Sequence, residues 1–123
     1  DTDIAGHAWG WMSAPYLQAA AMVDRGLTPL RASLEDPATL VIVCADHGGG
    51  GVLHNDHDHP HPVNDRIPLF LLGKRVQRGA TGVEPARLLD IPPTVLWALG
   101  GTAPAQYEGR VLNEAFVTEL ISA

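Results

Sequence analysis

The sequence has little cysteine and few basic residues. Its one cysteine, Cys44, excludes an internal disulfide framework and any metal site built on paired cysteines. Lys and Arg number 8 against 14 Asp and Glu, which argues against a nucleic-acid polymer or an anionic membrane surface as the main partner. No apolar run reaches the ~20 residues of a membrane helix, and no signal peptide is recognisable. With 123 residues, 46% of them hydrophobic, one compact domain is expected.

The first half of the chain predicts helix. Ser13, followed by Pro15, is a typical helix start, and an alanine-rich helical stretch runs from Tyr16 to Val23. Gly26 and Pro29 then interrupt the pattern. Pro29 either opens a second short helix or kinks one long helix.

Two continuous apolar runs predict buried strands, Thr39–Ala45 and Ile67–Gly73. Continuous rather than alternating hydrophobicity is typical of strands covered on both faces, so Cys44 is expected to be buried. Helix is predicted again from Glu84 to Gly100, with Asp90 capping the part that begins at Pro92 and Pro93. This order predicts an α/β fold with a mostly parallel sheet flanked by helices.

Three clusters of metal-ligand residues stand out, and they hold all six histidines. The first pairs Asp3 with His7, and the second is Asp46-His47, directly after the first predicted strand. The third is a histidine- and aspartate-rich loop, His54–His61. Imidazole and carboxylate ligands without thiolates suit Zn²⁺, Mn²⁺ or Fe in a site open to substrate.

Each cluster has a simpler explanation when taken alone. An Asp-x-x-x-His pair is common by chance, and a loop rich in His and Asp can be a solvated loop or an adventitious metal binder. Ionisable groups at the end of a buried strand are harder to explain without a function. Three such clusters in one short chain, holding every histidine, favour a metal site.

The order of the motifs resembles the alkaline phosphatase superfamily. The resemblance is carried by Asp3-x-x-Gly-His7, by Asp46-His47-Gly-Gly and by the Ile-Pro strand from Ile67, and then by Asp90-Ile-Pro-Pro-Thr and Glu108-Gly-Arg-x-Leu. It runs from Asp1 to about Phe116, and the type I phosphodiesterase/nucleotide pyrophosphatase and sulfatase-like branches are the most similar. It implies an alkaline-phosphatase-like fold, present here as its C-terminal portion.

The resemblance implies two divalent metal ions, Zn²⁺ first and Mn²⁺ as the alternative. Asp3 and His7 would bind one ion together with a histidine of the third cluster, and Asp46 and His47 would bind the other. His57 fits the phosphodiesterase spacing best, and His61 fits a mutase-like spacing. Paired cations about 4 Å apart stabilise the entering and leaving oxygens of an in-line displacement.

The nucleophile of that family lies upstream of the Asp-x-x-x-His segment, and no Ser or Thr here has a recognisable nucleophile setting. We therefore expect residues 1–123 to be the metal-binding C-terminal portion of a metal-dependent phosphoesterase that acts on a small phosphate ester. No catalytic residue is assigned, and the chain alone is expected to be inactive without the N-terminal half. The alternatives are a sulfatase-like hydrolase of the same superfamily, which would take a sulfate ester, and a non-catalytic metal-binding domain.

Overall fold

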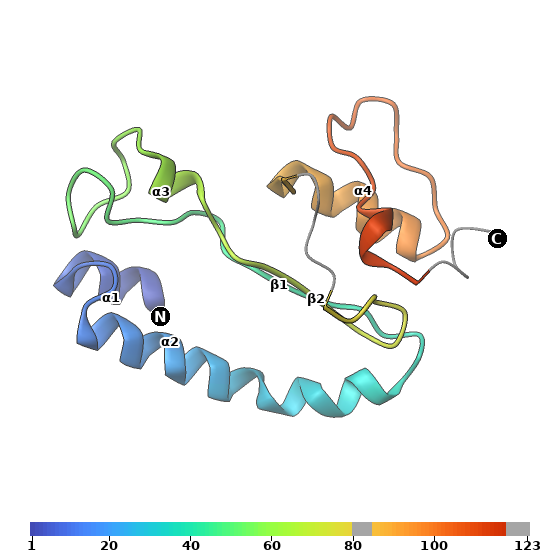
Figure 1. Ribbon diagram of the computed structural model, residues 1–123, viewed down its shortest axis with the longest axis horizontal. Helices are drawn as coiled ribbons and strands as arrows, with labels where there is room; N and C mark the ends of the chain where they lie inside the picture. The colour runs from blue at the N-terminus through green and yellow to red at the C-terminus, as the bar shows by residue number, and fades with distance from the viewer. Residues whose placement is uncertain (80–84, 118–123) are drawn as a thin grey trace. The chain divides into compact units, whose positions relative to one another are not determined.

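The computed structural model describes residues 1–79 and 85–117 (Figure 1). In chain order the elements are α1 (Thr2–Trp9), α2 (Ala14–Leu27), the 3₁₀ helix η1 (Thr28–Glu35), β1 (Val41–Cys44), α3 (Pro62–Asp65), β2 (Leu69–Leu72), the 3₁₀ helix η2 (Leu88–Asp90), α4 (Ile91–Ala98) and the 3₁₀ helix η3 (Asn113–Ala115). No helix of the described ranges is long and apolar enough to cross a membrane.

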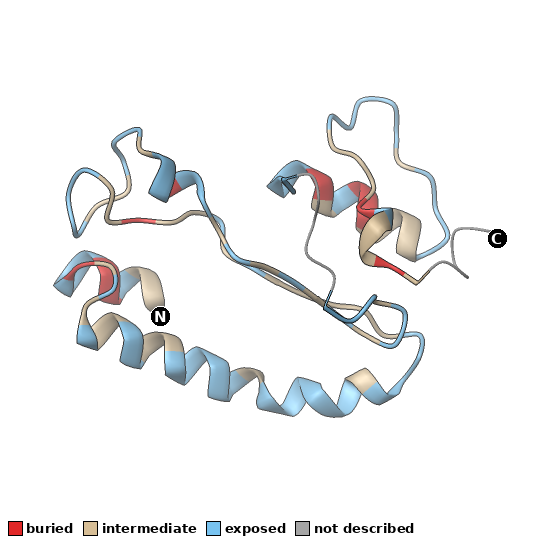
Figure 2. Ribbon diagram, in the orientation of Figure 1, coloured by how far each residue is buried: buried red, intermediate tan, exposed pale blue. Residues whose placement is uncertain are grey.

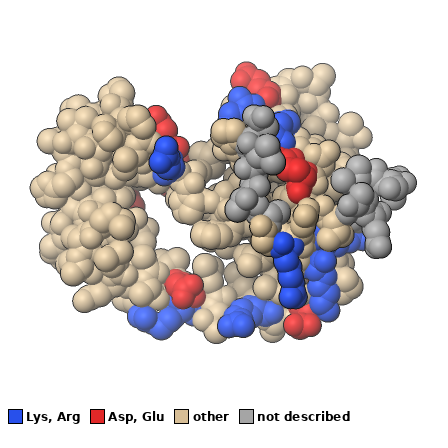
Figure 3. Space-filling view, in the orientation of Figure 1, with Lys and Arg blue, Asp and Glu red and all other residues tan. Residues whose placement is uncertain are grey.

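The chain divides into two compact units, and each is described by itself. Unit 1 comprises Asp1–Ser33 and Ile42–Phe70, and unit 2 comprises Leu34–Val41 and Leu71–Ala123. The buried apolar side chains of the described residues are few (Figure 2): Ala5 in unit 1, and Pro93, Leu112 and Phe116 in unit 2. Basic and acidic side chains lie among one another on the face drawn in Figure 3.

The helices of unit 1 begin at capped residues. Oδ1 of Asp1 accepts a hydrogen bond from the N–H of Ile4 at 2.9 Å, which caps α1. The expected start at Ser13 is confirmed, because its Oγ accepts from the N–H of Tyr16 at 3.3 Å. Past Gly26, α2 continues directly into η1, which begins at Thr28, so Pro29 does not begin a separate helix.

The described strands differ from the predicted parallel sheet. β1 and β2 form a two-stranded antiparallel sheet, and the expectation of a mostly parallel one is not met in this part of the chain. Residues 45–68, all described, hold only the four-residue α3 and no crossover element, so β2 runs back along β1.

The expected burial of both strands is also wrong. Phe70 is 58% exposed, Leu72 is 39% exposed, and the thiol residue Cys44 is exposed. A sheet of two strands has too few neighbours to cover both of its faces, so apolar residues on them stay accessible.

Unit 2 is organised around the carboxylate of Asp90, which is 1% exposed. It accepts hydrogen bonds from the N–H of Arg87 at 2.8 Å and the N–H of Arg110 at 2.9 Å. The Oγ1 of Thr94 donates to the carbonyl of Asp90 and accepts from the N–H of Leu112. Asp90 therefore joins the 87–94 segment to the 108–112 segment. It occupies the cap position of α4 but makes no side-chain capping bond there, contrary to the expectation.

Burial and the surrounding hydrogen bonds and charges have opposite effects on the pKa of Asp90. Burial alone would raise the pKa of the carboxyl group. The two backbone N–H donors and the positive charges of Arg87 and Arg110 outweigh burial, and together they hold the pKa below its ordinary value of 3.8. The ionised carboxylate is thus the form that the fold stabilises.

Candidate metal centre

Asp3 and His7 lie on the same face of α1, because four residues make about one turn of an α-helix. Nε2 of His7 is 3.5 Å from Oδ1 of Asp3. The sequence predicted that the two side chains point at one position, but it did not predict the helix that holds them. The segment is rich in glycine, which lowers helix propensity, and the cap at Asp1 together with burial of Ala5 and Gly6 offsets that cost.

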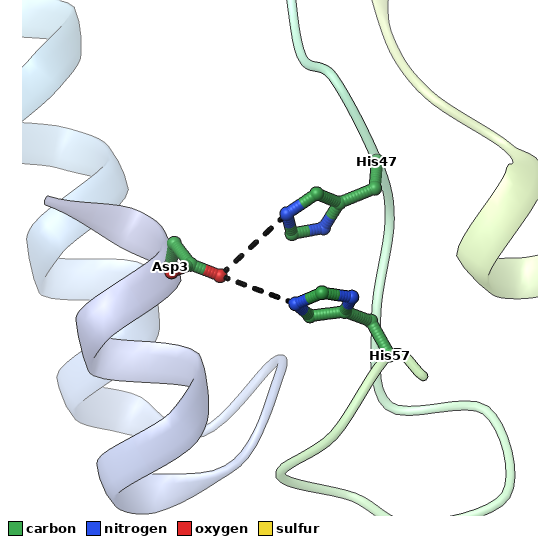
Figure 4. A group of neighbouring side chains, drawn as sticks. All are labelled: Asp3, His47 and His57. Atoms are coloured by element: carbon green, nitrogen blue, oxygen red, sulfur yellow. Dashed lines mark ion pairs between the residues drawn. The ribbon is translucent and has the colours of Figure 1, made fainter. Parts of the chain in front are cut away.

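Two histidines from later in the chain meet Asp3 (Figure 4). Oδ1 of Asp3 lies 3.8 Å from Nε2 of His47 and 3.9 Å from Nε2 of His57. One ligand atom from each of these three residues lies within 4.8 Å of the other two. The rings of His47 and His57 are stacked, with centroids 3.8 Å apart and planes 23° from parallel. All of these residues belong to unit 1.

The other ring nitrogen of each histidine faces an oxygen. Nδ1 of His7 is 3.0 Å from the carbonyl oxygen of Asn55, and Nδ1 of His47 is 2.8 Å from that of Gly48. A carbonyl oxygen can only accept, so in these two rings Nδ1 carries the proton, and Nε2 of the neutral ring is left as an acceptor. Nδ1 of His57 lies 3.6 Å from Oδ1 of Asp58, beyond hydrogen-bond distance.

Nε2 of His7 and Nε2 of His47, both acceptors, therefore face Oδ1 of Asp3, which is also an acceptor. Oδ1 of Asp3 is buried and has no hydrogen-bond partner among the described residues. A buried oxygen without a partner is costly, whereas a divalent cation would satisfy it and the surrounding nitrogens together. In a tetrahedral zinc site, with bonds of about 2.0–2.1 Å, ligand atoms are about 3.3–3.4 Å apart, slightly closer than observed here. The donor set therefore fits a divalent ion such as Zn²⁺ or Mn²⁺.

Asp46 and His61 stand outside this group of three. The side chain of Asp46 is 89% exposed, and its Oδ1 lies 3.8 Å from Nε2 of His47. His47 thus lies between two carboxylates, those of Asp3 and Asp46. Nδ1 of His61 accepts a hydrogen bond from the N–H of Val63 at 3.2 Å and caps α3. Of the two alternatives for the third cluster, the structure brings His57 to Asp3.

His59, another histidine of the loop, contacts Asp56. Nδ1 of His59 is 3.2 Å from Oδ2 of Asp56. The N–H groups of Asp58 and His57 donate to Oδ1 of Asp56, at 3.0 and 2.7 Å. The bond from Asp58 has the largest effect in lowering the pKa of Asp56, ahead of those from His57 and His59. Asp56 therefore turns the backbone that carries His57.

The sequence did not predict the structural roles of Asn64 and Asn55. Asn64 is 6% exposed, and its Nδ2 donates to the carbonyls of His57 and His59 at 3.0 and 2.8 Å. Its Oδ1 accepts from the N–H of Gly51 at 3.2 Å. This one side chain ties the histidine loop to the glycine run. Nothing in the sequence around Asn64, between Val63 and Asp65, indicates that its amide is buried.

Asn55 contacts His7 twice. Besides accepting from the His7 ring through its carbonyl oxygen, it donates from Nδ2 to the carbonyl of His7 at 3.5 Å. Both bonds link α1 to the histidine loop.

Hydroxyl groups considered as nucleophiles are already engaged. Ser13 caps α2, and Thr94 is fully buried with both a donor and an acceptor bond. Neither lies among the groups that surround Asp3 in unit 1. The bond of Ser13 agrees with its predicted position at a helix start.

Comparison with known proteins gives one consistent result. The profile of the Metalloenzyme superfamily matches residues 1–102. A 2,3-bisphosphoglycerate-independent phosphoglycerate mutase from Roseobacter denitrificans is 32% identical over 111 residues, which are 89% of this chain and 21% of that protein. The enzymes of the same name from Salinibacter ruber and Listeria monocytogenes are 31% and 29% identical, over 92% and 89% of this chain and 21% of their own lengths. No solved structure matches significantly.

Proposed function

This chain belongs to the Metalloenzyme superfamily, and from that premise we propose that it supplies the metal ligands of a phosphoryl-transfer centre for a small phosphate ester. The observation that carries the proposal is the buried Oδ1 of Asp3, which faces three Nε2 atoms and has no hydrogen-bond donor among the described residues. The similarity to phosphoglycerate mutases supports metal-dependent chemistry on phosphate esters.

Two ion positions are proposed. Asp3, His7 and His57 would hold one divalent ion, with His61 as the alternative third ligand, and Asp46 and His47 would hold the other. Bound there, the ions would supply Lewis-acid stabilisation of the phosphoryl oxygens. Zn²⁺ is the first candidate and Mn²⁺ the second, because both accept mixed imidazole and carboxylate ligands.

The chain's own residues have the task of binding and orienting. The carbonyls of Asn55 and Gly48 hold the Nδ1 protons of His7 and His47, which turns each Nε2 toward Asp3. Asn64 holds the backbone of His57 in place. Because these partners are already bonded in the structure, the ligands are arranged in advance of metal binding.

The nucleophile is proposed to come from residues outside 1–123. The chain spans 21% of the length of the mutases it matches. On this proposal the 123 residues are the C-terminal portion of the catalytic domain and are inactive alone. Strands from the remainder would extend the small sheet into the larger, mostly parallel sheet of an alkaline-phosphatase-like fold.

Among the subtypes, the similarity favours phosphoryl transfer of the mutase kind. The relatives reported above are all named phosphoglycerate mutases, so phosphoglycerate is the first substrate to test. A phosphodiesterase or nucleotide pyrophosphatase activity and a sulfatase-like activity are the alternatives from the same superfamily. A purely structural metal-binding domain is the non-catalytic alternative.

The test is an assay of the intact gene product that contains this sequence. We expect interconversion of 2- and 3-phosphoglycerate that chelator abolishes and Zn²⁺ or Mn²⁺ restores. Bis(p-nitrophenyl) phosphate and p-nitrophenyl sulfate are the parallel substrates. Hydrolysis of either one without mutase activity would overturn the mutase assignment, and no metal-dependent turnover of any of them would overturn the catalytic proposal.

A further inference from the structure

Trp11 sits beside the candidate metal centre in a slot made by glycines. A Cβ on Gly6 of α1 would lie 2.8 Å from the Trp11 ring, and a Cβ on Gly49 would overlap the ring. A Cβ on Gly50 would lie 2.9 Å from the Cβ of Trp11. The indole therefore lies between α1 and the glycine run, and no larger residue fits at these positions without moving it.

The ring of Trp11 meets two of the candidate ligands. Its centroid is 5.2 Å from that of His7 with planes at 83°, and 5.8 Å from that of His57 with planes at 77°. Edge-to-face pairs of aromatic rings at these separations are attractive. His7 belongs to α1 and His57 to the distant loop, so one indole contacts ligands from two segments.

The backbone of Trp11 is fixed to the same loop. Its N–H donates to the carbonyl of His54 at 2.7 Å. The neighbours on both sides have positive φ, 89° at Gly10 and 63° at Met12. Positive φ is uncommon for a residue such as Met. The turn is thus shaped to direct Trp11 back between the two segments.

We propose that Trp11 is a positioning residue that sets the spacing and orientation of His7 and His57 toward a metal ion. The inference rests on the proposed metal function of these histidines. Packing alone would require only that Trp11 fill space among apolar side chains. The aromatic partners of its ring include the two candidate ligands His7 and His57, besides Tyr16, whose centroid is 6.2 Å away.

Co²⁺ is the probe, because its visible absorption reports the geometry of its ligands. The 123-residue chain would be titrated with Co²⁺ as wild type and as the variants Trp11→Phe, Trp11→Leu and Asp3→Asn. Trp9→Leu is the matched control, since Trp9 lies two residues away and is 58% exposed. Circular dichroism and thermal melting establish that each variant is folded.

We expect Trp11→Leu to weaken Co²⁺ binding by about 10–100-fold, the usual effect of losing a partner that orients a metal ligand, and to change the absorption band. Trp11→Phe retains an aromatic edge and should restore both the affinity and the spectrum. Trp9→Leu should bind like the wild type. A folded Trp11→Leu with wild-type affinity and spectrum would overturn the inference.

Gly49→Ala provides a second variant that keeps the indole. Its added methyl must displace the Trp11 ring, so we expect weaker Co²⁺ binding in the same direction as Trp11→Leu. Unchanged binding in a folded Gly49→Ala would count against the inference. If the wild type itself binds no Co²⁺ and Asp3→Asn changes nothing, the metal function fails. If Asp3→Asn loses binding while every Trp11 variant retains it, only the positioning role fails.

Discussion

Each of the two units contains a carboxylate with a buried oxygen, and the two carboxylates differ in the hydrogen bonds that they accept. In unit 2, Asp90 receives two backbone N–H donors, and the guanidinium of Arg87 lies 3.5 Å from its Oδ1. In unit 1, the Oδ1 of Asp3 receives no hydrogen bond from the described residues and faces three imidazole nitrogens. The protein itself completes the surroundings of the first carboxylate and leaves those of the second incomplete.

The difference separates a carboxylate that stabilises the fold from one that is proposed as a metal ligand. A carboxylate whose acceptors are filled by the chain stabilises the fold and has no capacity left for a cation. A carboxylate oxygen that receives no hydrogen bond from the described residues still has capacity for a cation. The comparison agrees with a stabilising role for Asp90 and with the metal-binding role proposed for Asp3, and each can be tested by changing one residue.

The largest effect is expected from Asp3→Asn. We expect Zn²⁺ affinity of the 123-residue chain to fall by more than about a hundredfold, beyond the usual effect of losing a partner that only orients a ligand. The amide can donate to the neighbouring Nε2 atoms, so the free energy of unfolding without metal should change by less than about 0.5 kcal/mol. Isothermal titration calorimetry and urea unfolding measure the two quantities.

Asp24→Asn is the control for that variant, since Asp24 is exposed on α2 and is not one of the candidate ligands. It should bind Zn²⁺ like the wild type. Wild-type affinity in Asp3→Asn would remove the distinction between the two carboxylates.

Asp90→Ala should have the opposite profile. It leaves the N–H groups of Arg87 and Arg110 without their acceptor, and we expect a loss of about 2 kcal/mol in the free energy of unfolding. Zn²⁺ affinity of the folded protein should stay unchanged, because the ligands belong to unit 1. Urea unfolding followed by calorimetric titration tests both, and a folded variant with lost affinity would contradict the assignment.

Asn64→Asp sharpens the comparison within unit 1. The change keeps the size of the side chain but replaces its N–H donors with an oxygen that faces the carbonyls of His57 and His59. We expect about tenfold weaker Zn²⁺ binding, at the low end for loss of an orienting partner. Asn113→Asp, at an exposed position, is the control, and equal affinity in the two variants would show that the loop does not need this clamp.

The smallest expected effect is on how the free energy of unfolding depends on pH in acid. The pKa of Asp90 is lowered below 3.8 in the folded protein, so its ionised form adds stability above that pH. The contribution is lost as the pH falls below about 4 through the lowered folded pKa. In Asp90→Asn, unfolding free energy measured by urea should therefore decline less steeply between about pH 4 and pH 2 than in the wild type. Parallel declines would show that Asp90 is not the responsible group.

Local chemistry made parts of the fold predictable. Ser13 and Pro15 indicate a helix start that depends on one hydroxyl, and Gly100, with φ 79°, lies just past the end of α4. The strands were identified near their observed places. Their burial and direction were not, because both depend on which elements lie beside the sheet.

The candidate site was predictable in its residue types and less so in its arrangement. The four-residue spacing of Asp3 and His7 is preserved on one helix face whether or not the helix itself is foreseen. The choice between His57 and His61 depends on the path of a loop that is held by Asn64, and that hydrogen bonding joins positions with no shared sequence pattern. The exposure of Asp46 likewise depends on side-chain rotation that spacing does not determine.

The paired bonds between His7 and Asn55 have a kinetic consequence. One bond uses the ring of His7 and the other its backbone carbonyl, and both end on the same loop residue. Swinging the imidazole away from Asp3 therefore breaks one attachment of the loop, and lifting the loop frees the imidazole. The exchange rate of an ion held by these ligands would therefore be set by the rate of loop opening. The ligands would be released together and not one after another.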